Sequence, residues 1–414
     1  MNIEVDGVGG TPRAVVVGGG IGGLTAAAAL IGRGWQVTVL ERAAAPKPAG
    51  AGIALAPNGL RALDVIGLGD AVRALAAWQG DGGLRTPRGR WLSRTDARAA
   101  ADAFGGPVVL LHRATLIDTL AAALPAGTVR TGEAAELADR GAADRPAVVR
   151  TAGGEIEADL VVGADGIHSA LRASLFPAHP GPEYAGFTTW RLVVAGPARP
   201  FAPHETWGPG RLWGTQPLKD GRVYAYAAAR TPRDGHGAEG ELPVLRRLFG
   251  TWHDPVPAVL AAAGEGAVLR NDVHWMAKSL PVHHRGRVAL IGDAAHAMAP
   301  TLGQGGNQAL EDAVVLAHCA DPHGDLAVSL ARYSAERVPR TRAMTDKAER
   351  VARLAMTRNP AGVAARNTLI RALRLLGPGS ALRPFADIMD WQPPATRMLT
   401  RQGSRTPLGD RETP

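Results

Sequence analysis

The stretch RAVVVGGGIGGLTAAAALIGRGWQVTVLER, residues 13–42, decides the fold. Its apolar run Ala14–Val17 is typical of a buried parallel strand, and the residues after the glycines, Leu24–Ile31, have the composition of a helix. A second strand, Trp35–Leu40, follows the helix. Strand, glycine-rich turn, helix and strand in this order predict the first βαβ unit of a Rossmann-like α/β domain.

The glycines of this turn have the G-x-G-x-x-G spacing at Gly18, Gly20 and Gly23. In such a unit the first glycine permits the tight turn, the second lets the backbone approach a pyrophosphate, and the third allows close helix–strand packing. The helix N-terminus offers free N–H groups to the phosphates. Glu41, at the end of the second strand, is placed to accept hydrogen bonds from ribose hydroxyls. The segment predicts a bound dinucleotide but leaves NAD and FAD open, because both contain this half.

Two distant segments favour a flavin. ADLVVGADGIHSALR, residues 158–172, is a strand followed by a tight turn. GRVALIGDAAHAMAPTLGQGGNQALEDAVVLA, residues 286–317, is a strand that ends at Gly292-Asp293, a proline-containing loop and a glycine-rich helix start. A carboxylate at a strand end suits sugar-like hydroxyls, and a glycine-rich helix start suits anionic charge. We expect a long ligand with a polyol chain and an anionic far end.

These three segments resemble the single-component FAD-dependent monooxygenases, the group A aromatic hydroxylases. Shorter similarities, such as LLHRATL and TTWRLVV, extend the resemblance over residues 12–395. It implies FAD as cofactor, NADPH or NADH as transient electron donor, and insertion of one atom of O2 into an aromatic or heteroaromatic small molecule through a C4a-hydroperoxyflavin. The alternatives are an epoxidase or Baeyer–Villiger-type oxygenase of the same fold acting on a polyene, polyketide or terpenoid, or a non-catalytic FAD-binding protein.

The resemblance also implies roles for individual residues. It places Arg42 beside the ribose or pyrophosphate, Arg113 against FAD, Asp165 between FAD and the pyridine nucleotide, and Asp293 at the ribityl hydroxyls. Pro300 and the glycines after it are implied to line the isoalloxazine. The complete set of expected cofactor-binding residues is Gly18, Gly20, Gly22, Gly23, Glu41, Arg42, Arg113, Ala135, Asp165, Asp293, Pro300, Gly303, Gly305, Gly306 and Asn307.

Residues 179–280 differ from the rest, because tryptophans and tyrosines recur at short intervals in alternating segments. The Asp220-Gly221 pair between two such segments predicts a β-hairpin. We therefore expect an inserted, mostly antiparallel substrate sheet, joined by a hairpin near residues 82–94. An arginine in an apolar strand needs an anionic partner, either a substituent of the substrate or a structural carboxylate, which makes Arg191 a candidate for holding substrate. The candidate substrate-binding residues are Trp190, Arg191, Trp213, Tyr224 and Tyr226, and the candidate catalytic residues are Arg191, Pro300 and Tyr226.

The predicted organisation is α/β: a FAD-binding domain from residues 12–178 and 281–330, the substrate sheet at 179–280, C-terminal helices at 331–398 and a disordered tail at 399–414. A hydrophobic fraction of 46% and a charged fraction of 20% are those of a globular protein. The net charge of +8 is dispersed, without the basic stripe of a nucleic-acid-binding protein. We expect no metal site, no membrane span and a cytoplasmic location, the last because Cys319 is a lone cysteine. The sequence leaves the oligomeric state open.

Overall fold

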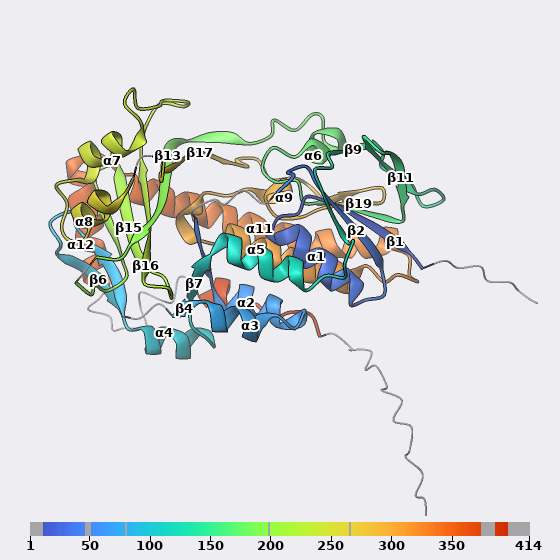
Figure 1. The fold of residues 1–414 in the computed structure, drawn as a ribbon, viewed down its shortest axis with the longest axis horizontal. Helices are drawn as coiled ribbons and strands as arrows, with labels where there is room; N and C mark the ends of the chain where they lie inside the picture. Colours follow the sequence, from blue (N-terminus) through green and yellow to red (C-terminus); the bar gives the residue numbers. More distant parts are fainter. Residues whose placement is uncertain are drawn as a thin grey trace, which may run out of the picture.

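The computed structural model describes residues 11–45, 51–78, 81–197, 199–264, 266–373 and 386–395. Within them the chain builds two large β-sheets, one mainly parallel and one mainly antiparallel (Figure 1). The expected tail at 399–414 lies outside the described residues. No helix among the described residues has the length and apolar character needed to cross a bilayer.

The six-stranded sheet carries the glycine-rich turn at its centre. Its apolar strands pair in parallel except at one edge, where β18 is antiparallel to β19. Helices α1 (Ile21–Ile31) and α10 (Gly305–Cys319) pack on one another beside this sheet. In spatial order its strands are β18 (His284–Arg285), β19 (Val288–Leu290), β12 (Leu160–Gly163), β1 (Arg13–Val17), β2 (Gln36–Glu41) and β8 (Val129–Thr131).

Two small sheets flank this unit. The first has the order β3 (Gly52–Leu55), β7 (Val109–His112), β4 (Ala77–Trp78), and the second has the order β11 (Gly154–Ala158), β10 (Ala147–Thr151), β9 (Ala135–Asp139). Four helices lie near the first small sheet along the chain: α2 (Pro57–Val65), α3 (Gly69–Leu75), α4 (Ala97–Phe104) and α5 (Arg113–Ala122).

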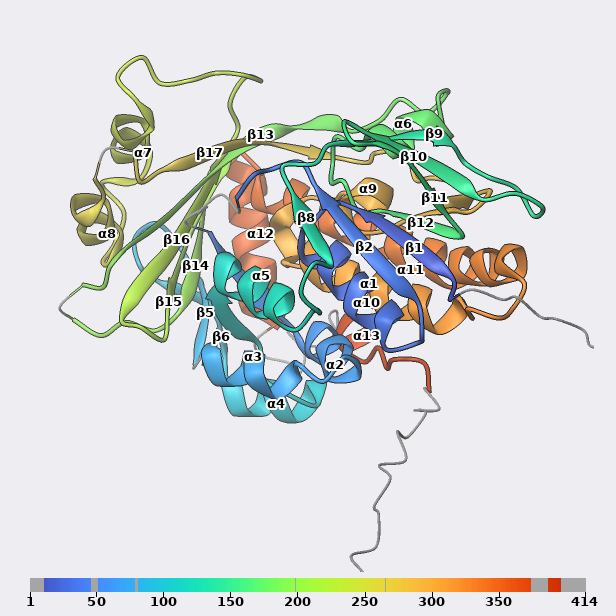
Figure 2. The same cartoon turned by 45° about the vertical axis from the view of Figure 1, so that its right-hand side comes forward.

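The seven-stranded sheet is the second large unit. Its strands, in spatial order, are β17 (Leu269–Trp275), β13 (Glu183–Ala195), β16 (Arg222–Ala229), β15 (Arg211–Pro217), β14 (His204–Gly208), β5 (Gly82–Arg85) and β6 (Trp91–Thr95). The pairs are antiparallel except for β14 with β5. Figure 2 shows β13 and β17 running on from this sheet toward α6 (Ala170–Leu175).

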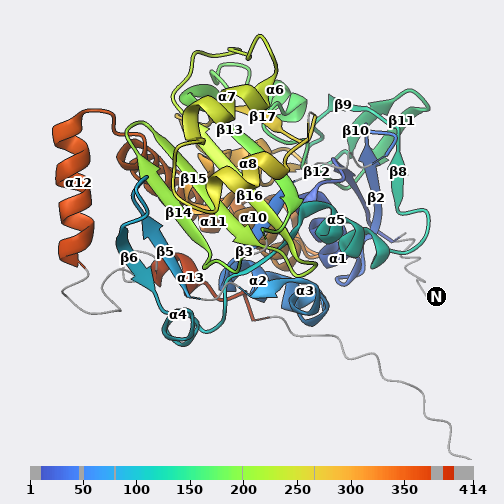
Figure 3. The same ribbon diagram turned by 60° about the vertical axis from the view of Figure 1, so that its left-hand side comes forward.

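The two faces of the seven-stranded sheet are covered differently. Helices α7 (Glu241–Phe249) and α8 (Val256–Ala262) cover one face (Figure 3). The other face packs on α11 (Leu326–Ala355), the 30-residue helix that also contacts α10. The remaining described helices are α9 (Asp293–His296), η1 (Pro300–Leu302), α12 (Pro360–Leu373) and α13 (Ala386–Met389). The mixed α/β class with a Rossmann-like domain and a mostly antiparallel second sheet is confirmed.

Candidate active site

The three glycines of the first turn meet three different surroundings. Gly18 has φ +110°, and a Cβ on it would lie 2.3 Å from the Ala164 carbonyl oxygen. A Cβ on Gly23 would lie 1.9 Å from the Gly18 carbonyl oxygen, so this position is closed by backbone packing. Around Gly20, in contrast, no described heavy atom lies within 4 Å of a built Cβ. The space beside Gly20, at the N-terminus of α1, is therefore open to a ligand.

Glu41 is fixed against this turn by both of its carboxylate oxygens. Oε2 accepts a hydrogen bond from the Gly19 N–H at 2.7 Å, and Oε1 accepts one from the Ala43 N–H at 2.8 Å. A carboxylate has about four lone-pair sites, so each oxygen can accept a further hydrogen bond. Glu41 thus holds the glycine turn in place and keeps acceptors for ribose hydroxyls, while Arg42 beside it is exposed.

The turn after β12, which contains Asp165, has one buried hydrogen-bond acceptor without a described partner. Oδ2 of Asp165 accepts a hydrogen bond from the Leu171 N–H at 3.2 Å, whereas its buried Oδ1 has no partner among the described residues. Arg172 is 4% exposed and donates to the carbonyls of Ile167 at 2.7 Å and Ala294 at 3.1 Å. Arg172 therefore links this turn to α9 by hydrogen bonds, and Asp165 has an oxygen that can bind a ligand.

Asp293 begins α9 with an exposed carboxylate to which no described residue donates a hydrogen bond. A Cβ on Gly305 would lie 3.8 Å from Asp293 Oδ1, so the carboxylate faces the first turn of α10. Arg113 has accessible surface yet is crowded by protein atoms, as expected of a side chain that lines a recess. Burial lowers the pKa of Arg113, and the negative charge of Asp293 opposes that shift.

Residues 300–307, here called the Pro300 loop, comprise η1, the two residues after it and the first residues of α10. Gly303 ends η1 in the left-handed region, with φ +62°, and Gln304 precedes the first residue of α10. The first turn of α10 contains no acidic residue of its own, and the Asp293 carboxylate faces it. The partial positive charge at this helix N-terminus favours an anionic group nearby.

The Asn307 side chain makes its hydrogen bonds within the protein, so the predicted cofactor contact of this residue is left to its backbone. Its amide is fully buried and donates to the Gly303 and Ala54 carbonyls at 2.8 and 3.2 Å, while its Oδ1 accepts from the Ala56 N–H at 3.0 Å. Both donors and the oxygen are thereby used within the protein. The Asn307 side chain fastens the Pro300 loop to β3 and is not available to contact a cofactor.

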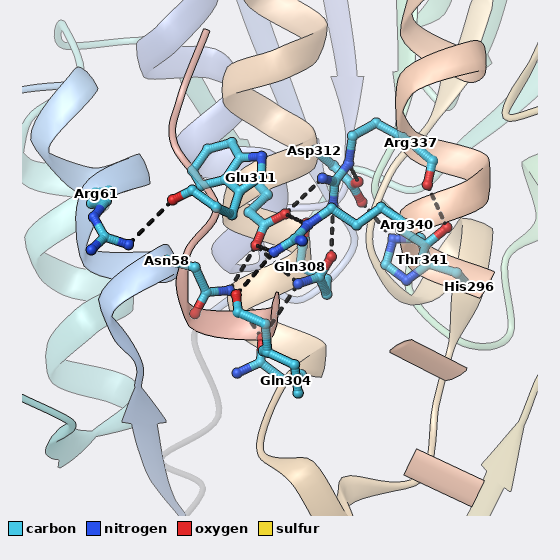
Figure 4. Close-up of polar contacts among 12 residues, drawn as sticks. Asn58, Arg61, His296, Gln304, Gln308, Glu311, Asp312, Arg337, Arg340 and Thr341 are labelled. Atoms are coloured by element: carbon cyan, nitrogen blue, oxygen red, sulfur yellow. Dashed lines mark hydrogen bonds and ion pairs between the residues drawn. The ribbon is translucent and has the colours of Figure 1, made fainter. Parts of the chain in front are cut away.

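A buried polar network supports the Pro300 loop from behind (Figure 4). Gln304 Oε1 accepts hydrogen bonds from the Asn58 and Gln308 amides at 3.0 and 3.3 Å. Both amides also donate to Glu311, at 2.7 and 3.0 Å. Two arginines of α11 complete the network as the ion pairs Arg337–Glu311, Arg337–Asp312 and Arg340–Glu311. The start of α10 is thus held by α2 and α11 together.

One row of side chains lies on the face of the seven-stranded sheet that packs on α11. Arg191 is the cross-strand partner of Tyr226, and Tyr226 and Leu302 of the loop both pack against the apolar cluster that the sheet shares with α11. Tyr224, two residues before Tyr226 on the same face, lies so close to β3 that a Cβ on Gly52 would be 2.6 Å from its ring. Arg191 donates a hydrogen bond to Asn271 Oδ1 and has a buried, unpartnered Nε. Arg191, Tyr224 and Tyr226 therefore share one face of the sheet, and their role as pocket residues stays a prediction.

Trp190 and Trp213 correct the sequence prediction. They are 1% and 0% exposed and belong to the core beneath α7 and α8, on the face away from the Pro300 loop. Their indole N–H groups are used internally, by Glu241 at 2.6 Å and Thr215 at 2.8 Å. Because successive residues of a strand point to opposite faces, Trp190 and Arg191 face different sides of the sheet. The two tryptophans are core residues and do not line a substrate pocket.

The sequence analysis did not identify Glu205, a carboxylate on β14 on the same face as Tyr226. It accepts a hydrogen bond from the Tyr226 hydroxyl at 2.7 Å and another from the Trp207 indole. Burial raises its pKa, and the two hydrogen bonds oppose the shift. The available signal was an acidic residue inside the alternating strand HETWG, residues 204–208.

A sequence profile described as the FAD binding domain matches residues 12–240 and 255–348 of this chain. The chain belongs to this family of FAD-dependent monooxygenases. It is 36% identical to aurachin C monooxygenase/isomerase of Stigmatella aurantiaca over 366 residues, which are 87% of this chain and 94% of that protein. It is 37% identical to 3-amino-4-hydroxybenzoate 2-monooxygenase of Streptomyces cremeus over 362 residues, 82% of this chain and 86% of the relative.

The solved structures agree. The crystal structure of Klebsiella pneumoniae HpxO with FAD and uric acid superposes with a TM-score of 0.82 at 28% identity, covering 91% of the monooxygenase and 96% of HpxO. The predicted family, the FAD cofactor and the monooxygenase activity are therefore confirmed.

The residues present fit FAD. The chain offers open space beside Gly20, a buried Asp165 Oδ1 without a described partner, and an exposed Asp293 carboxylate that faces the first turn of α10. Together with Glu41 they would hold the ribose, pyrophosphate and ribityl groups, and the first turn of α10 would face the ring system. When bound, FAD supplies the redox and oxygen chemistry of the reaction. The individual contacts, including those of Gly22, Arg42, Arg113 and Ala135, remain predictions.

Proposed function

We propose that this monooxygenase inserts one atom of O2 into an aromatic or heteroaromatic small molecule and consumes NADPH or NADH. The names of its relatives support an aromatic substrate, because they specify 3-amino-4-hydroxybenzoate, urate and a 2-heptyl-4-quinolone product. We also propose that it works in the cytoplasm, which its free, buried Cys319 suits.

The observation that carries this proposal is the approach of the seven-stranded sheet to the Pro300 loop. Tyr226 and Leu302 of the loop pack against the same apolar cluster, and Tyr224 clusters with Leu110 of β7. A flat substrate held against these two rings would lie over the cofactor ring. Offset stacking on tyrosines favours aromatic compounds over saturated ones.

The chain's own residues then have three tasks. Arg191, whose neighbour Arg113 adds positive charge, attracts and orients an anionic substituent of the substrate. The N-terminus of α10 stabilises negative charge at the edge of the cofactor ring. The apolar residues shared by the sheet, η1 and α11 limit the access of water to the reacting groups.

The test is direct. The purified protein should carry a flavin absorption spectrum and consume NAD(P)H faster with some members of a panel of phenols, hydroxybenzoates and 4-quinolones. Each accepted compound should gain one oxygen atom by mass spectrometry, and 18O2 should label it. NAD(P)H oxidation that yields only hydrogen peroxide with every aromatic compound, but an oxygenated product with a polyene or a ketone, would overturn the proposal.

A further inference from the structure

A recess of about 310 Å³ lies where the start of β13, the ends of β16 and β17 and the C-terminal end of α11 meet. Its lining is mainly apolar and includes the buried Phe187, Met356 and Ala299, the last directly before the Pro300 loop. None of the described residues assigned above to cofactor or substrate lines it. An apolar lining with a few charged groups, at this volume, is typical of small-molecule pockets, so the recess is a candidate binding site of its own.

A β-bulge in β13 forms one wall of the recess. In the register of the sheet, the three β13 residues 185–187 lie opposite a single residue of β17. Gly186, in the middle of the bulge, has φ +80°, and a Cβ on it would lie 3.9 Å from Arg230 Nη1. The bulge therefore brings the strand backbone against the Arg230 guanidinium. Such bulges bend a strand and are over-represented next to functional sites.

The charged groups of the lining leave one cation without an acidic partner. Arg353 forms an ion pair with Glu349. Arg230 Nε donates to the Met356 carbonyl at 3.1 Å, and no described carboxylate forms an ion pair with Arg230. Arg230 is exposed, so its remaining N–H groups can donate to an arriving anion. A guanidinium binds a carboxylate through two parallel hydrogen bonds, which makes a carboxylate the anion that suits this position.

The aromatic side chains of Phe187 and Trp275 both line the recess. Offset or edge-to-face contacts with such rings favour a flat aromatic ligand. We propose that the recess is an accessory binding site for an aromatic carboxylate, whose ring packs on Phe187 and Trp275 and whose carboxylate binds Arg230. The site lies outside the residues proposed to hold the oxygenated substrate, and the proposal does not depend on the proposed function.

Nuclear magnetic resonance of methionine methyl groups tests binding at this place. The FAD-loaded protein, labelled with 13C at these methyls, is titrated with 2-naphthoate and with its uncharged twin 2-naphthamide. The Met356 signal, assigned with Met356→Leu, should shift and saturate, because an aromatic ring alters the magnetic field at a neighbouring methyl. Naphthoate should reach half-saturation at a concentration about threefold or more below that of the amide, as for an exposed ion pair. The Met276 signal should not shift, because Met276 belongs to another apolar cluster.

Three variants locate the ligand. Ala185→Phe should abolish the Met356 shift, because the partly buried Ala185 lines the recess and a phenyl ring would fill it. Arg230→Gln should make the two half-saturation concentrations equal, whereas Arg230→Lys should keep the preference for naphthoate. The matched control is Arg233→Gln, which removes an arginine outside the recess that pairs with Asp234 and is 65% exposed. It should behave as wild type.

The proposal is wrong if neither compound shifts the Met356 signal, if both saturate it at the same concentration, or if the shift persists in Ala185→Phe. An equal shift of Met276 would show a general rearrangement and would also overturn it. If Ala185→Phe does not fold, Arg230→Gln decides, because an unchanged preference for naphthoate in this surface variant rejects the site.

Discussion

Asp312 and Arg337 meet at the interface of α10 and α11, where Arg337 Nε donates to Asp312 Oδ1 at 2.6 Å and both side chains are fully buried. Oδ2 of the same carboxylate accepts from the Gly292 N–H at 2.8 Å and contacts His296 Nε2 at 2.5 Å (Figure 4). Gly292, at φ +57°, directly precedes Asp293. The pair thus links α11 to the turn that presents Asp293 to the cofactor.

Arg337→Met should therefore be strongly destabilising. It removes the arginine partner of the buried Asp312, and breaking a buried ion pair typically costs about 3–5 kcal/mol of unfolding free energy. Chemical denaturation of the FAD-loaded protein would measure this change. Arg353→Met is the matched control, because Arg353 belongs to the same helix but pairs with Glu349 at the surface with 69% of its side chain exposed. The control should change stability by less than about 0.5 kcal/mol, and equal effects of both variants would contradict the assignment.

Asp293→Ala should separate cofactor binding from stability. Because no described residue donates to the Asp293 carboxylate, the apoprotein should keep its unfolding free energy within about 0.5 kcal/mol. FAD affinity should fall at least about tenfold, or ~1.4 kcal/mol, as measured by quenching of FAD fluorescence during titration with apoprotein. Glu41→Ala should lower both quantities, since Glu41 also binds two backbone N–H groups. Unaltered FAD affinity in Asp293→Ala would exclude this carboxylate from the site.

Substitutions at the adjacent residues Trp190 and Arg191 should have opposite effects on KM and on the unfolding free energy. Arg191→Ala should raise KM for an accepted anionic substrate about tenfold or more, with FAD affinity and stability nearly unchanged, because its charge lies near that of Arg113 on the sheet face that carries Tyr226. Trp190→Phe should lower the unfolding free energy by about 1–3 kcal/mol and leave KM unchanged, because Trp190 lies in the core with its N–H bonded to Glu241. A higher KM in Trp190→Phe would show that this tryptophan does line the substrate pocket.

His283 should contribute to acid sensitivity. Burial, with the nearby His296, lowers its pKa to about 3, so the folded state holds it neutral. Because the folded pKa lies below the unfolded value of about 6.5, its stabilisation is complete above that pH and is lost as the pH falls toward 3. The slope of unfolding free energy with pH should reach ~1.4 kcal/mol per unit for this group.

The variant that tests this is His283→Phe, in which the slope between pH 6 and 4 should be smaller than in wild type. His323→Gln, at an exposed position, should retain the wild-type slope. An unchanged slope in His283→Phe would show that other groups cause the acid sensitivity.

Much of the cofactor-binding unit could be predicted from sequence because its signals are local. Gly18, Gly20 and Gly23 lie within six residues, and the backbone of a single turn makes the same demands wherever it occurs. The predicted positions of Asp165 and Asp293, each following a strand, agree with the structure, and their contacts with FAD stay predictions. The hydrogen bonds of the Asn307 side chain could not be predicted, because its partners Ala54 and Ala56 are about 250 residues away along the chain.

The substrate side could be predicted only in part. Strand alternation alone shows that Trp190 and Arg191 cannot share a face, but it does not say which face meets the Pro300 loop. That choice, the hydrogen bond between Tyr226 and Glu205, and the burial of Asp312 against Arg337 were decided by tertiary structure. The physical reason is that strand register and helix packing depend on the burial of apolar surface from segments far apart in the chain. The glycine-rich turn, the strand-end acids and the α/β order depend instead on local backbone chemistry. The sequence by itself determined these local features.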